Sequence, residues 1–172
     1  EVKDSVRPDA ELRLKRSLVL SKFAELEGIV VEEADVEAEV ETMAASAGEQ
    51  ADMIRLIFNG EQGKENIKRS LLTRKTFGKL IEITNDLAAY LARRIAESDD
   101  LEALPESPEL SVVCFRHLPG GRTAAELLDP ELLDLYQDRL QRALEVSGEG
   151  WVSTTKLRGR TYLRAGVMNP MT

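Results

Sequence analysis

The chain has 172 residues, of which 42% are hydrophobic, so it is long enough for one ordinary domain or two small ones with a buried core. Its formal net charge of −8 disfavours binding of nucleic acid, because contacts to phosphates need a concentrated positive surface. A single cysteine, Cys114, excludes an intramolecular disulfide and a cysteine-based zinc site, and no apolar run approaches the roughly 20 residues that a membrane span needs.

The first half of the chain has helical periodicity and almost no strand signal. Pro8 followed by acidic residues predicts the start of a helix, and Gly28 predicts its end. Four apolar residues of this helix recur at helical spacing on one face: Leu12, Val19, Phe23 and Leu26. Three further helices are predicted, one that ends at Gly48, one over 50–58 and one over about 63–83.

The second half mixes helix and strand signals. A helix is predicted around Leu87 and Ile95, where apolar residues share one face. Asp129 and Pro130 predict the start of another helix, which ends near Gly148. Three segments rich in apolar and β-branched residues predict strands: 110–115, 151–157 and 160–168.

Together these elements predict an α+β fold in two parts. Residues 1–84 are expected to form an all-α arm of four helices, and residues 85–172 a small α+β domain with a mainly antiparallel sheet. Arg158-Gly159 is the expected hairpin turn between the last two strands. Residues 110–115 are apolar on both faces, so we expect the helical half or a second copy of the chain to cover the outer face.

The acidic stretch over residues 32–41 is a candidate metal site, because hard cations bind several carboxylate oxygens. Glu33, Glu37 and Glu41 form one row at helical spacing, but no histidine or converging loop accompanies them. Apolar Val36 lies on the other side of the same helix. We therefore interpret the row as a solvated helix face and expect no metal site.

Cys114 and His117 are the residues with the most potential for catalysis. Because they lie three apart on a predicted strand, their side chains point to opposite faces, which disfavours mutual activation. Cys114 is more simply a small apolar residue of the core, and His117 has no nucleophile pattern nearby. We therefore expect no catalytic and no cofactor-binding residue in this chain.

The remaining signal consists of apolar and adaptable side chains in the first half. Such stripes usually form a core, yet a small helical unit has much surface, and a methionine-rich groove can bind varied apolar segments. The candidate residues for binding unfolded polypeptide are Phe23, Met43, Met53, Leu56, Ile57, Phe58 and Phe77.

The first half closely resembles the C-terminal chaperone region of bacterial trigger factor over about residues 1–84. Four segments carry the resemblance: 12–20 (LRLKRSLVL), 24–29 (AELEGI), 33–44 (EADVEAEVETMA) and 70–80 (SLLTRKTFGKL). The resemblance implies helical arms that cradle nascent or unfolded chains. It includes neither a ribosome-docking segment nor a prolyl-isomerase domain, so it implies neither of those activities.

The second half, about residues 86–172, looks like the C-terminal small domain of the pyridoxal-phosphate-dependent group II amino-acid decarboxylases. Four segments carry this resemblance: 108–119 (PELSVVCFRHLP), 140–148 (LQRALEVSG), 151–155 (WVSTT) and 157–170 (LRGRTYLRAGVMNP). Those enzymes hold their cofactor on a lysine of the large domain, and Lys156 does not match that lysine. The resemblance therefore implies a fold and an interface with a large domain, and not decarboxylation.

Three functional hypotheses follow. The leading one is a non-enzymatic, ATP-independent protein that binds unfolded or nascent polypeptide in the bacterial cytoplasm, with the second half as a non-catalytic appendage. The alternative is a fragment or subunit of a pyridoxal-phosphate-dependent amino-acid decarboxylase that is inactive without its large domain. A third is a scaffold that forms homo-oligomers. The first residue is not methionine and the composition changes near Ile83, which favours a fusion or a segment of a longer protein.

Overall fold

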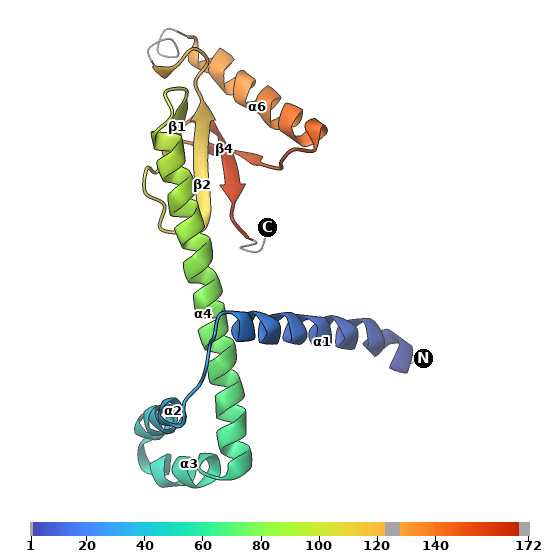
Figure 1. Ribbon diagram of the computed structural model, residues 1–172, viewed down its shortest axis with the longest axis vertical. Coiled ribbons are helices and arrows are strands. Elements are labelled where there is room, and N and C mark those ends of the chain that lie inside the picture. The colour runs from blue at the N-terminus through green and yellow to red at the C-terminus, as the bar shows by residue number, and fades with distance from the viewer. Residues whose placement is uncertain (1, 123–127, 169–172) are drawn as a thin grey trace. The chain divides into compact units, whose positions relative to one another are not determined.

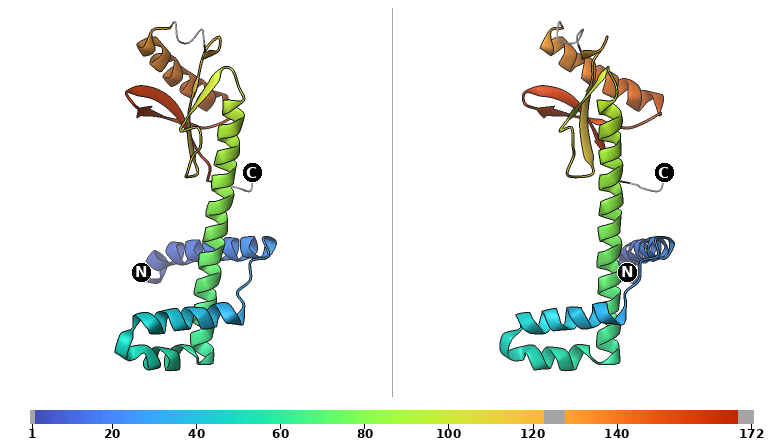
Figure 2. Two further views of the ribbon diagram at one scale, coloured as in Figure 1. Left: turned by 90° about the vertical axis from the view of Figure 1, so that its left-hand side faces the viewer. Right: turned by 60° about the vertical axis from the view of Figure 1, so that its left-hand side comes forward.

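The computed structural model describes residues 2–122 and 128–168, with side chains from residue 9 onwards. The fold is α+β, as the sequence predicts, and it divides into two compact units, Glu1–Lys79 (unit 1) and Leu80–Thr172 (unit 2). Helix α4 (Glu61–Ala96), which Figures 1 and 2 show as one continuous helix, contributes its first part to unit 1 and its remainder to unit 2. None of the helices in the described residues combines the length and the apolar character needed to cross a membrane.

Unit 1 is helical in its described residues. Besides the first part of α4, its elements are α1 (Val2–Leu26), α2 (Glu33–Ser46), the 3-10 helix η1 (Gly48–Gln50) and α3 (Ala51–Phe58). Gly28 (φ 63°) and Gly48 (φ 57°) have the left-handed backbone conformation in which glycine commonly ends a helix. The predicted ends of the first two helices are therefore confirmed.

The core of unit 1 forms where α2 packs against α4. Val36 and Val40 of α2 and Ile67 and Leu71 of α4 are buried together, and Val31 of the preceding loop joins them. Valine and isoleucine at helical spacing present one apolar stripe on each helix, so the two stripes bury each other. The apolar stripes of α2 and α4 thus form the core of unit 1.

Unit 2 contains a four-stranded antiparallel sheet and α6 (Pro130–Ser147), which packs against β3 and β4 (Figure 1). The strands, in the order β1-β2-β4-β3, are β1 (Leu101–Leu104), β2 (Val112–His117), β4 (Arg160–Gly166) and β3 (Ser153–Leu157). Arg158 (φ 52°) and Gly159 (φ 76°) form the turn between β3 and β4, which confirms the predicted hairpin. Asp129 caps α6 by accepting a hydrogen bond from the Glu131 N–H.

Two faces of β2 are covered by different helices of unit 2. Val113 packs against Ala88 and Ala92 of α4, where small side chains allow the helix to approach the sheet closely. Arg116 points to the other face and is buried beside Asp134 of α6. Helix α6 of the same unit thus covers the outer face at Arg116. For residues 110–115 the expectation that the helical half or a second copy covers the outer face stays a prediction.

Two predicted boundaries are wrong, and one strand is absent from the prediction. The helices expected on either side of Ile83 form one helix, because residues 84–86 contain neither glycine nor proline and the apolar spacing continues. Helix α1 begins at Val2, so Pro8 lies inside it, where it removes one backbone hydrogen bond without ending the helix. Strand β1 was not predicted, since its four residues are too few to display an alternating pattern.

Candidate functional site

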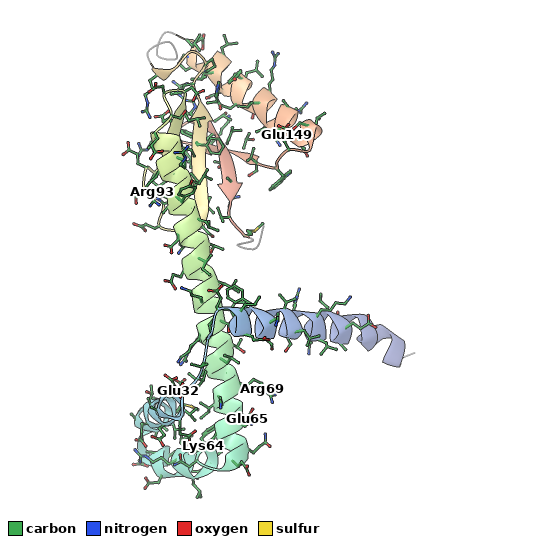
Figure 3. All side chains as sticks on the ribbon, viewed as in Figure 1. Glu32, Lys64, Glu65, Arg69, Arg93 and Glu149 are labelled. Atoms are coloured by element: carbon green, nitrogen blue, oxygen red, sulfur yellow. The ribbon has the colours of Figure 1, made fainter. Side chains whose placement is uncertain are left out.

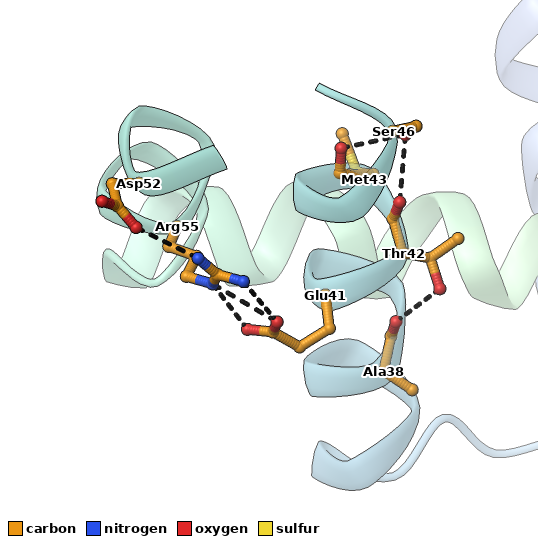
Figure 4. A network of polar contacts seen from close by, with 7 residues as sticks. All are labelled: Ala38, Glu41, Thr42, Met43, Ser46, Asp52 and Arg55. Atoms are coloured by element: carbon orange, nitrogen blue, oxygen red, sulfur yellow. Dashed lines mark hydrogen bonds and ion pairs between the residues drawn. The ribbon is translucent and has the colours of Figure 1, made fainter. Parts of the chain in front are cut away.

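Four carboxylates of α2 are bound by cations from α3 and α4. Four ion pairs connect these helices: Glu33 with Lys64, Asp35 with Lys75 (2.6 Å), Glu39 with Arg74 (2.7 Å) and Glu41 with Arg55 (2.8 Å). Figure 3 shows Lys64 at the start of α4. Figure 4 shows Arg55 binding both carboxylate oxygens of Glu41 and also Asp52. The predicted row of Glu33, Glu37 and Glu41 is thus exposed to solvent, and two of its members also form ion pairs, which the sequence did not predict.

These ion pairs change the titration of the acidic side chains. The pKa of the carboxyl groups of Glu33, Asp35, Glu39 and Glu41 is lowered, chiefly because each accepts a hydrogen bond from its cation. The pKa of the Lys64 ammonium is raised by the same kind of contact with Glu33. Among the described residues, no three or more metal-ligating side chains lie together. The four ion pairs thus connect the acidic helix α2 to α3 and α4.

The seven residues predicted to bind polypeptide lie in different environments. Phe23 is only 6% exposed, so its ring belongs to the interior and is left out of the candidate surface. Met43 and Phe58 are half-buried and pack against the core around Ile67. Their apolar atoms mainly stabilise unit 1. The exposed fractions of the other four are 59% for Met53, 80% for Leu56, 55% for Ile57 and 49% for Phe77.

Three of the exposed residues form one surface on α3. Met53, Leu56 and Ile57 follow the i, i+3, i+4 spacing of a single helix face, and we call this surface the α3 face. Phe58 packs inward and Arg55 is tied to Glu41, so α3 is held in place with this apolar face exposed. A rigid helix that exposes several large apolar side chains has the physical character of a docking surface.

The fourth exposed residue, Phe77, lies in a groove where α1 crosses α4. The groove has a volume of about 510 Å³, and its walls are Phe77 together with Lys15, Arg16, Val19 and Leu20 of α1. We call it the α1 groove. Its volume falls in the range of about 300–1,000 Å³ that is typical of ligand sites. The sequence does not reveal this groove, because Val19 shares one apolar helix face with Phe23, and such a face is typical of a packed core.

The other side of the same helix crossing is different in character. The hollow there has a volume of about 90 Å³, and Leu20 of α1 borders it together with hydroxyl-bearing side chains that include Ser17, Ser21 and Thr73. It is too small and too polar to take a large apolar side chain. Of the two hollows at this crossing, only the α1 groove therefore suits an apolar ligand.

His117 and Cys114 do not face one another in unit 2. The Nδ1 atom of His117 lies 2.9 Å from the hydroxyl oxygen of Tyr136, and Nε2 lies 3.6 Å from Oδ2 of Asp100. Burial raises the pKa of the Cys114 thiol, which disfavours the reactive thiolate. His117 and Cys114 therefore have different neighbours and do not form a shared reaction centre.

Comparison with known proteins relates unit 1 to one family. Residues 1–82 match the family model described as the C-terminus of bacterial trigger factor protein. The trigger factor of Agathobacter rectalis is 34% identical over 102 residues, which cover 59% of this chain and 23% of that protein. The trigger factor of Thermomicrobium roseum is 31% identical over 127 residues, 72% of this chain and 26% of that protein. This chain thus spans about a quarter of the length of these relatives.

Solved structures share a fold with part of this chain. Mouse CSAD has 23% identity and a TM-score of 0.50, and the match covers 61% of this chain and 24% of that one. The glutamate decarboxylase domain of a Vibrio parahaemolyticus protein has 24% identity and a TM-score of 0.49, covering 63% and 22%. At such identities the likeness concerns the fold alone. The first half of this chain is thus similar to the C-terminal region of bacterial trigger factor, and the likeness to mouse CSAD shows a shared fold alone.

Proposed function

We propose that this chain binds exposed apolar segments of unfolded or nascent polypeptide, without ATP and without catalysing a reaction. The observation that carries the proposal is the pair of exposed apolar surfaces on unit 1, the α3 face and the α1 groove. They lie in the part of the chain that matches the C-terminus of trigger factor. The same likeness supports a location in the bacterial cytoplasm.

The physical basis of binding is burial of apolar surface. Leu56 and its neighbours on α3 gain free energy when a client side chain covers them, because apolar area leaves water. An unfolded polypeptide exposes such side chains along its whole length. Burial of this kind is non-directional and tolerates varied sequences, so it needs neither a nucleotide nor a fixed recognition motif.

An unfolded polypeptide binds more tightly to a surface that is already ordered before it arrives. The ion pairs of Glu33, Glu39 and Glu41 join α2 to α3 and α4, and they leave the α3 face in place before a client arrives. Binding then costs less ordering of the protein itself, which favours affinity. In this proposal the acidic helix acts indirectly, by positioning the apolar residues.

The proposal is tested by the aggregation of an unfolding test protein, followed by light scattering with and without this chain. Suppression at a few-fold molar excess and without nucleotide supports the proposed function. The variant Leu56→Ser/Ile57→Ser should lose most of the suppression, because it removes two exposed apolar side chains and none from the core.

The matched control for this test is Val146→Ser. Val146 is 88% exposed on α6, so the substitution also removes an exposed apolar side chain, but from unit 2. It should leave suppression unchanged. No suppression by the parent chain at several-fold excess would contradict the proposal, and so would equal losses in the α3 variant and the control. Assembly of the chain without a client would instead favour the scaffold hypothesis.

A second candidate function is that of a subunit of a pyridoxal-phosphate-dependent decarboxylase, which the fold of unit 2 favours. A pyridoxal phosphate site needs a lysine in an enclosed pocket with groups that bind phosphate. Lys156 is exposed on β3 and lines neither of the hollows described above, so the residues present do not fit the cofactor. We expect no borohydride-reducible adduct on Lys156 when the cofactor is added. Such an adduct would favour the decarboxylase function.

A further inference from the structure

We infer that the α1 groove selects apolar segments that carry a carboxylate beside the apolar side chains. This inference rests on the proposed function and names the client chemistry of one of its two surfaces. The groove combines an apolar floor, made by Val19, Leu20 and Phe77, with two cations, Lys15 and Arg16. None of its lining residues is an acid.

The two cations of the groove are available to a ligand. Among the side chains that the structure describes, no carboxylate forms an ion pair with Lys15 or Arg16. Other cations of unit 1 are occupied: Arg74 binds Glu39 and Lys75 binds Asp35. Although the chain as a whole carries a net charge of −8, the groove therefore presents positive charge.

The stems and the head groups of these side chains have different roles. Lys15 and Arg16 line the groove and are both exposed. Long cationic side chains of this kind can extend an apolar wall with their methylene groups and keep their charged ends in water. A client whose apolar side chain covers Phe77 would bring its neighbouring residues near these charged ends. An aspartate or glutamate there gains attraction, and a lysine or arginine meets repulsion.

The α3 face has a different charge environment, so the preference belongs to the groove. Asp52 lies one helical turn before Leu56 on α3, and its side chain is exposed. The α3 face therefore offers no cationic advantage to an acidic client. A preference that comes from the α1 groove should survive substitution of Leu56, whereas one that comes from the α3 face should not.

The test measures binding of the full chain to fluorescent peptides that share one apolar core and carry glutamate, glutamine or lysine on both flanks. Fluorescence anisotropy at low salt should give roughly two- to tenfold tighter binding for the glutamate peptide than for the glutamine peptide, as expected for one or two exposed ion pairs. The lysine peptide should bind most weakly. The difference should shrink in 1 M salt, because salt screens exposed charges.

The decisive variant is Lys15→Glu/Arg16→Glu, which should reverse the order of the glutamate and lysine peptides. The control is Arg13→Glu/Lys22→Glu, which makes the same change of charge on α1 outside the groove and should keep the original order. Lys15→Gln/Arg16→Gln should abolish the preference without reversing it. Circular dichroism checks that each variant keeps its helices.

The outcomes separate this inference from the proposed function. Equal binding of all three peptides, together with suppression of aggregation by the chain, would overturn the inference and leave the proposed function standing. An unchanged order of affinities in Lys15→Glu/Arg16→Glu would also overturn it, because the preference would then come from another surface. No peptide binding and no suppression of aggregation would overturn both.

Discussion

Gln137 of α6 binds both backbone groups of His117 in β2. The His117 N–H donates to Oε1 of Gln137 over 3.0 Å, and Nε2 of Gln137 donates to the His117 carbonyl oxygen over 2.8 Å. The pairing of β2 with β4 ends at Phe115, opposite Leu163. The Gln137 amide therefore takes the place of a neighbouring strand at the end of β2, and its side chain is fully buried there.

Replacement of this amide should open the end of β2. In Gln137→Leu the N–H and the carbonyl of His117 lose their partner in a buried place, which should cost about 1–3 kcal/mol. Hydrogen exchange at the His117 amide should become faster. Gln141→Leu is the control, because Gln141 is less buried and donates only one hydrogen bond to the backbone, to Val152. Unchanged exchange at His117 in the first variant would contradict this account.

A second prediction concerns the buried ion pair between α6 and the sheet. Oδ1 of Asp134 accepts hydrogen bonds from Nη2 of Arg116 (2.7 Å) and from the Thr161 N–H (3.1 Å). Asp134→Ala should destabilise unit 2 by about 3–5 kcal/mol, because it leaves the Arg116 charge buried without a partner. Urea unfolding checks the loss. Asp138→Ala, on the exposed side of the same helix, should change stability little.

The stability that Asp134→Ala loses should be partly recovered when the charge of Arg116 is removed as well. If the loss in Asp134→Ala comes from the stranded Arg116, then Arg116→Met/Asp134→Leu should recover a substantial part of it. A double variant no more stable than Asp134→Ala would show that the hydrogen bond to Thr161 carries the effect instead.

Two helical glycines of unit 1 should respond in opposite ways to substitution by alanine. A Cβ atom at Gly63 would lie 2.5 Å from the Ile57 carbonyl oxygen and 2.7 Å from Cα of Phe58, so Gly63→Ala must displace the backbone between α3 and α4. A Cβ atom at Gly78 meets nothing within 4 Å. Gly78→Ala should therefore stabilise the chain by about 0.5–1 kcal/mol, whereas Gly63→Ala should destabilise it.

Thermal unfolding followed by circular dichroism measures both glycine variants. The melting temperature should rise for Gly78→Ala and fall for Gly63→Ala. A rise for both would mean that the chain between α3 and α4 can move without cost, which would contradict the close approach at Gly63.

The acidic helix α2 should make the stability of unit 1 depend on pH. The ordinary pKa is 4.5 for Glu33, Glu39 and Glu41, and the folded chain lowers it through their cation partners. In this range the unfolded state binds more protons than the folded state, so stability rises with pH. The stabilisation is complete above the unfolded pKa and is lost as the pH falls through the folded pKa.

Urea unfolding between pH 7 and pH 3 checks this prediction against Glu33→Gln/Glu39→Gln/Glu41→Gln. The parent chain should be more stable than the variant at pH 7, and the two should converge in acid. A constant difference over the whole range would contradict the proposed role of these carboxylates. Added salt should reduce the difference at pH 7, because the side chains of Glu33 and Glu41 are exposed and that of Glu39 is partly exposed.

Much of the fold could be predicted from the sequence, because its signals are local. Gly28 and Gly48 mark helix ends through their backbone freedom, and Arg158-Gly159 supports a hairpin turn. The spacing of Val36 and Val40 predicts the buried side of α2. Such signals depend on residues close in the chain, so they require no knowledge of tertiary contacts.

The rest depends on contacts between residues far apart in the sequence. Phe23 and Val19 have the same apolar character and lie on the same predicted face, yet the first is buried and the second is exposed. The partners of Glu39 and Glu41 come from different helices, and periodicity does not identify them. For the same reason the α1 groove could not be predicted, since Phe77 reaches it only through the crossing of α1 and α4.

The most direct test of the proposed function is site-specific photo-crosslinking to an unfolded client. A photoreactive amino acid is placed singly at Leu56, at Phe77 or at the control position Val146, all of which are exposed. We predict crosslinks to the client from the first two positions, lost when the client is folded, and few from Val146. Equal crosslinking from all three positions, or none from Leu56 and Phe77, would contradict the account.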